Sequence, residues 1–156
     1  MLALLERYAA VVATHRLCPY EQSLGHTIVV LDRAFDVELV VGAIATTSAR
    51  VVHVVFPCLP RDASHVFERR CNDVAARVRG RGSVHAAFHP AMTGGREDAD
   101  RRVGLVRRAP DPLLQLVPVE LPHVTARPIA ELDVVLGELD ALHAARRQLA
   151  ELGVAA

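Results

Sequence analysis

The sequence predicts a single α/β domain, residues 1–156, with a three- to four-stranded, largely parallel sheet and helices packed against it. A chain of 156 residues that is 51% hydrophobic has the size of one domain and can bury a core. Short β-branched apolar runs alternate with longer segments whose apolar residues recur at helical spacing. Neither a linker nor an internal repeat divides the chain. Alternation of this kind favours parallel strands joined by helices.

The first third of the chain predicts a helix, a strand and a second helix. Apolar residues recur at helical spacing over residues 2–17, and Pro19 pushes the residue before it out of the helical region. The β-branched run Thr27–Leu31 predicts a buried strand. Residues 35–45 are compatible with a short helix or a strand, and we favour the helix.

The middle of the chain predicts strand, helix and strand. The run Val51–Phe56 is apolar on both faces, as expected for a strand in the middle of a covered sheet. A helix should follow from Asp62 or Ser64 to Arg79, and the strand Val84–Phe88 comes next. The inner face of that helix would consist of the apolar residues Phe67, Cys71, Val74 and Val78.

The last third contains a long loop, a proline-rich segment and a helix. The loop 90–107 exceeds the usual limit of about 12–15 residues, so it is either functional or partly disordered. Prolines 118 and 122 rule out a long helix after residue 113, and we expect a short helical turn followed by an edge strand. The C-terminal helix should cover about 129–152. Its inward positions are Leu132, Val135, Leu139, Leu142, Arg146 and Leu149.

That spacing predicts packing of the C-terminal helix on the domain's own sheet, with a homodimer seam as the alternative. The 18 basic and 18 acidic residues give a formal net charge of zero, so no nucleic-acid partner is expected. No apolar run is long enough to cross a bilayer and no leader is recognisable, so we expect no membrane partner and a cytoplasmic location. Three unevenly spaced cysteines do not make a disulfide framework and should be reduced.

Cys18 and His89 are the candidate catalytic residues. His89 ends the third predicted strand beside Pro90, where it could act as a general acid or base. With Cys18 it could instead ligate a metal, and iron or haem are the cofactor candidates. The alternatives are a histidine that hydrogen-bonds loop backbone and a cysteine buried at a helix end. His85 lies about 13 Å from His89 along an extended strand, so the two are not paired as ligands of one ion.

Arg107 and Arg108 are the candidate binding residues for a small-molecule substrate. They precede Pro110 and Pro112 in a stiff turn, and guanidinium groups held in this way suit a carboxylate or phosphate. In the alternative, they pair with acidic residues of the same loop, Glu97, Asp98 and Asp100. His53 lies in the middle of a strand and is interpreted as a core histidine with its hydrogen bonds satisfied.

Three short motifs occur in order: Leu17-Cys18-Pro19-Tyr20, Phe88-His89-Pro90 and Arg108-Ala109-Pro110-Asp111-Pro112. In this order and spacing the chain resembles the domain of unknown function 1415 family of small bacterial proteins, from the first helix to about Leu116. The resemblance implies that Cys18, His89 and Arg108 are the positions to test, and it implies no particular activity. Gln115 stands where the family pattern leads us to expect a histidine, so it joins the candidate substrate-binding residues.

Two functional hypotheses follow. In the first, the chain is a small enzyme in which Cys18 and His89 form a thiolate–imidazole or metal site and Arg108 holds an anionic small molecule, and these side chains converge in one pocket. In the second, it is a non-catalytic binding or assembly protein that uses the C-terminal helix or the 91–107 loop. The second hypothesis predicts an exposed apolar stripe on that helix.

Overall fold

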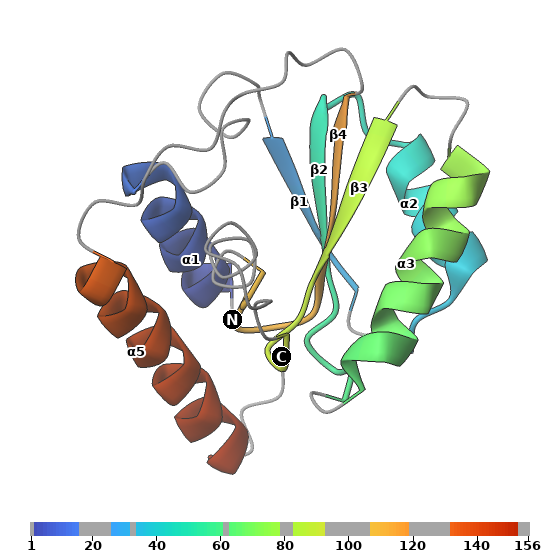
Figure 1. Ribbon diagram of the computed structural model, residues 1–156. Coiled ribbons are helices and arrows are strands. Elements are labelled where there is room, and N and C mark those ends of the chain that lie inside the picture. Colours follow the sequence, from blue (N-terminus) through green and yellow to red (C-terminus); the bar gives the residue numbers. More distant parts are fainter. Residues whose placement is uncertain are drawn as a thin grey trace.

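A four-stranded mixed sheet lies between two pairs of helices, as the computed structural model shows (Figure 1). The structure describes residues 2–15, 26–31, 34–60, 63–78, 83–92, 107–118 and 132–152. The elements of these segments, in chain order, are α1 Leu2–Thr14, β1 His26–Val30, α2 Val37–Ala45, β2 Val51–Val55, α3 Ser64–Val78, β3 Ser83–Phe88, β4 Leu113–Pro118 and α5 Leu132–Glu151.

The strand order is β1-β2-β4-β3, and the sheet is mixed rather than largely parallel. β1 pairs with β2 in parallel, whereas β4 is antiparallel to both of its neighbours, β2 and β3. β1, β2 and β3 therefore run in the same direction, as expected for strands connected through α2 and α3. β4 follows the segment 107–112 and runs in the opposite direction between β2 and β3.

The expectation of a helical turn and an edge strand after residue 113 is wrong. Residues 113–118 form β4, an interior strand, and side chains 113–117 are all buried. Proline is tolerated in this strand because Pro118 is its last residue, opposite Ser83 at the start of β3.

The remaining predicted elements that fall within the described residues are confirmed, with small shifts at their ends, but the expectation that the first strand is buried is wrong. β1 is an edge strand that pairs only with β2 in the sheet order, so the side chains of Thr27, Ile28 and Val29 are half-buried and Val30 is exposed. Residues 37–45 form the helix α2 that we favoured over a strand. The carboxylate of Asp36 caps it, because its Oδ1 accepts hydrogen bonds from the backbone N–H groups of Glu38, at 2.8 Å, and Leu39, at 3.1 Å. The apolar face predicted for α3 is buried as expected.

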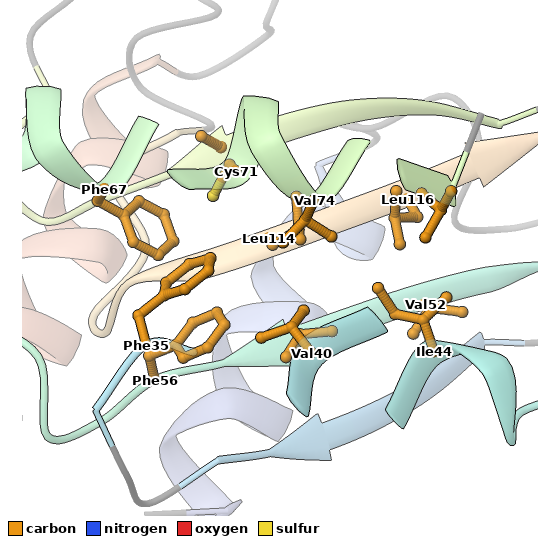
Figure 2. Packing of buried hydrophobic residues seen from close by; sticks show 13 residues of the cluster. Phe35, Val40, Ile44, Val52, Phe56, Phe67, Cys71, Val74, Leu114 and Leu116 are labelled. Carbon is orange, nitrogen blue, oxygen red and sulfur yellow. The ribbon is translucent and has the colours of Figure 1, made fainter. Parts of the chain in front are cut away.

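The sheet has a hydrophobic core on each face. On one face, side chains of α2 and α3 pack on alternate residues of β2 and β4, namely Val52, Val54, Leu114 and Leu116. Figure 2 shows this core, in which Phe35 stacks on Phe56 at 4.5 Å between ring centroids and Phe67 meets both rings edge-on. On the other face, α1 and α5 cover the sheet. Because side chains of a strand alternate between faces, the two cores share the same strands.

α5 contributes its predicted inward residues Val135, Leu139 and Leu142 to the second core. The spacing of its apolar residues therefore reflects packing on the domain's own sheet. Among the side chains of 133–152 that the structure describes, the large apolar ones that are exposed are Val134 and Leu152, and these two do not make a stripe. No helix in the described part of the chain has the length and apolar character that a bilayer span requires.

Cys71 is a core residue of α3, and its burial makes an alkaline pH dependence of stability testable. Burial raises the pKa of the Cys71 thiol, and the nearby carboxylate of Glu68 raises it further. The folded protein thus keeps a proton that the unfolded thiol loses above about pH 9. Below about pH 9 both states keep the thiol proton, and the free energy of unfolding is unaffected by it. As the pH rises further, only the unfolded state loses the proton, so the free energy of unfolding falls.

We expect Cys71 to make the free energy of unfolding fall by about 1.4 kcal/mol for each pH unit above about pH 9. Urea unfolding of the wild type and of Cys71→Ala between about pH 8 and pH 10 measures this. The variant lacks the thiol, so its stability should fall less steeply. Equal slopes for the two proteins would contradict the assignment.

Candidate functional site

His89 lies directly after β3 and is completely buried. Its backbone N–H donates to the carbonyl oxygen of Arg107 at 2.8 Å. In the ring, Nδ1 accepts from the backbone N–H of Ala91 at 3.2 Å, and Nε2 lies 3.2 Å from the carbonyl oxygen of Pro60. Because Nδ1 accepts and a carbonyl can only accept, Nε2 carries the proton and the imidazole is neutral. This arrangement agrees with the alternative in which His89 binds loop backbone.

A metal-ligating role does not fit His89 in this conformation. An imidazole ligates a metal through a nitrogen lone pair, and the lone pair of Nδ1 already accepts the Ala91 hydrogen bond while Nε2 holds a proton. Within the described ranges, no three histidine, cysteine, aspartate or glutamate side chains are grouped as metal ligands would be. Cys18 and the loop residues 93–106 lie outside the described residues, so the proximity of Cys18 to His89 stays a prediction.

Arg108 is held against α5. Its guanidinium Nη2 lies 3.5 Å from Oδ1 of Asp140, and its backbone carbonyl oxygen accepts a hydrogen bond from Nε2 of His143 at 3.0 Å. Its side chain remains one-third exposed. The proposed partners Glu97, Asp98 and Asp100 lie outside the described residues, and the partner that the structure shows comes from the C-terminal helix instead.

The same turn carries a buried ion pair that sequence reasoning did not assign. Nε of Arg146 donates to Oδ1 of Asp111 at 2.9 Å, and its Nη2 donates to the carbonyl oxygen of Pro57 at 3.2 Å. Both side chains are buried. Asp140, His143 and Arg146 recur every three residues, so one face of α5 holds the turn that leads into β4. The sequence did contain one sign of this ion pair: Arg146 occupies an inward position in the predicted C-terminal helix, where the other inward residues are apolar.

Gln115 does not join His89 and the arginines. It lies in the middle of β4, directly opposite His53 of β2 in the antiparallel register, and both side chains are buried. The side-chain nitrogen of Gln115 is 2.9 Å from Nε2 of His53. Because an amide NH2 group can only donate, Nε2 of His53 accepts, and this imidazole is neutral as well. The interpretation of His53 as a buried, hydrogen-bonded histidine is confirmed.

The His53–Gln115 pair forms the polar floor of a pocket between α1 and the sheet. We call it the α1 pocket, and its other lining residues are Leu5, Tyr8, Ala9, Val12, Ile28, Val55, Phe88 and Leu113. The empty space is about 410 Å³ when the mouth towards solvent is included, but only about 20 Å³ admits the centre of a water-sized sphere. The enclosed part therefore has room for one or two molecules of the size of water, and a larger ligand must also occupy the opening towards solvent.

Comparison with known protein families, curated proteins and solved structures finds no match to this chain. The fold and the α1 pocket define the class of protein: a mixed α/β domain with a mainly apolar pocket on one face of its sheet. The buried imidazole and carboxamide give this mainly apolar pocket two polar groups that can orient a bound molecule.

Proposed function

We propose that the protein is a small enzyme that binds a small molecule in the α1 pocket, with His53 as its acid–base group. The observation that carries this proposal is the His53–Gln115 hydrogen bond of 2.9 Å at the floor of an otherwise apolar pocket. Polar groups in such pockets orient ligands, and imidazole is the commonest acid–base group of enzymes.

This proposal moves the expected site from His89 to His53. The two histidines lie on different faces of the sheet: His89 contacts the ring of Phe67 of α3 at 5.7 Å between centroids, whereas His53 lines the pocket beneath α1. Both ring nitrogens of His89 are occupied by backbone groups, so His89 supports the fold near the turn. Cys18 lies outside the described residues, so its part in the site stays a prediction.

The runner-up proposal is a non-catalytic binding or assembly protein that uses α5 or the 91–107 loop. It receives less support, because the inward residues of α5 are already buried against the sheet and α1. Membership in the domain of unknown function 1415 family also stays a proposal. It is supported by the order and spacing of the three motifs in the sequence. A cytoplasmic location belongs to the same proposal.

The test is a screen of small metabolites by thermal shift, followed by turnover assays of the hits. Hits should perturb the NMR signals of the His53 ring, and His53→Ala should lower turnover about 100- to 10,000-fold, the usual contribution of an acid–base group. The matched control is His85→Ala, because His85 is a strand histidine outside the pocket that bonds to Asn72 of α3. Equal binding and turnover in both variants would contradict the proposal, provided that circular dichroism shows both to be folded.

A further inference from the structure

The charge of the α1 pocket indicates the chemical class of its ligand. In the described part of the chain, ten residues line the pocket, and they include no arginine, aspartate or glutamate. A carboxylate or phosphate that enters a mainly apolar site without a cation loses its hydration and gains no ion pair in return. The lining therefore favours a ligand without net charge.

The polar floor leads to the same conclusion. His53 accepts the hydrogen bond from Gln115 at Nε2, so its ring is neutral in this conformation. The floor thus offers hydrogen bonds rather than a charge. Two arginines that contact α5 or belong to it are paired with carboxylates away from the pocket: Arg108 pairs with Asp140, and Arg146 with Asp111.

The walls suit an apolar ligand body. Phe88 and Tyr8 contribute aromatic rings, and Leu5, Val12 and Ile28 contribute aliphatic surface. Each apolar group that moves from water onto these side chains gains from the hydrophobic effect. We infer that the α1 pocket takes a neutral, mainly apolar small molecule with one hydrogen-bonding group, of the kind represented by a phenol or a short alcohol. This inference rests on the proposed function, and it differs from the anionic substrate expected from Arg107 and Arg108.

The experiment compares phenol with benzoate, which share a ring but differ in charge at neutral pH. Each is titrated into the 15N,13C-labelled full chain, and binding is followed at the His53 ring signals. We expect phenol to bind at least about tenfold more tightly than benzoate, because only benzoate must bring a charge into the pocket. Nuclear Overhauser effects from phenol to the methyl groups of Leu5 and Val12 would locate it without any variant.

Two neighbouring residues of α1 supply matched variants. Ala9 lines the pocket, whereas Ala10 is exposed and does not line it. Ala9→Phe should place a ring in the pocket and weaken phenol binding at least about tenfold, and Ala10→Phe should leave phenol binding unchanged.

The outcomes separate this inference from the proposed function. If benzoate binds in the pocket as tightly as phenol or more tightly, the inference on ligand class is overturned and the pocket remains a small-molecule site. If neither phenol nor benzoate binds, the inference on ligand class and the proposed function are both overturned. The same holds if phenol shows no contacts with Leu5 and Val12 and its binding is not weakened by Ala9→Phe.

Discussion

Arg146→Ala is expected to lower the free energy of unfolding by about 3–5 kcal/mol, which is the usual cost of removing one partner of a buried ion pair. The reason is that Arg146 satisfies two groups from different parts of the chain, the carboxylate of Asp111 and the carbonyl oxygen of Pro57. Without the guanidinium, the completely buried Asp111 loses its cation. Urea unfolding followed by circular dichroism measures the loss.

Arg147→Ala is the matched control, because Arg147 is the next residue on α5 and is exposed. We expect it to change stability by no more than about 0.5 kcal/mol. A second variant tests the cause: Asp111→Leu combined with Arg146→Met replaces both charges by apolar groups and should recover much of the lost stability. If Arg146→Ala costs less than about 1 kcal/mol, the ion pair does not hold the turn as the structure indicates.

Local sequence patterns were sufficient to predict the helices and three of the four strands. The β-branched runs of β1 and β2 and the helical spacing of α3 each lie within one short segment, so their partners need not be known. The approach failed for β4, because Pro118 in it and Pro122 after it in the sequence indicated an edge strand. Its interior position depends on pairing with β2 and β3 on both sides, and Pro118 is tolerated only because the strand ends there.

The site was harder to predict, because its contacts join segments that are distant in the sequence. Gln115 was selected because the family resemblance leads us to expect a histidine at its position, yet the register of β2 and β4 places it against His53, 62 residues away. That register could not be known once 113–118 was expected at an edge. Arg146 was placed at an inward helical position, where a charged group needs a buried partner, but its partner Asp111 could not be named because it lies 35 residues away.

His89→Ala is expected to lower the free energy of unfolding by about 3–5 kcal/mol, a cavity cost of the size measured for large buried side chains plus the cost of unpaired backbone groups. The imidazole is completely buried and bridges two loops, through Ala91 after β3 and Pro60 before α3. Its removal leaves a donor and an acceptor without their ring partner. Chemical unfolding with His85→Ala as the control measures the effect, and the partly exposed His85 should cost about 1 kcal/mol or less.

The comparison of His89→Ala with the wild type decides between the two roles considered for this histidine. A residue that supports the fold changes stability, whereas an acid–base group at an active site changes turnover and often leaves stability unchanged or higher. If His89→Ala unfolds at the same urea concentration as the wild type but loses activity on a hit from the metabolite screen, His89 belongs to the catalytic site. The expected result, a large loss of stability in His89→Ala and a folded, inactive His53→Ala, would place the chemistry on the α1 face of the sheet.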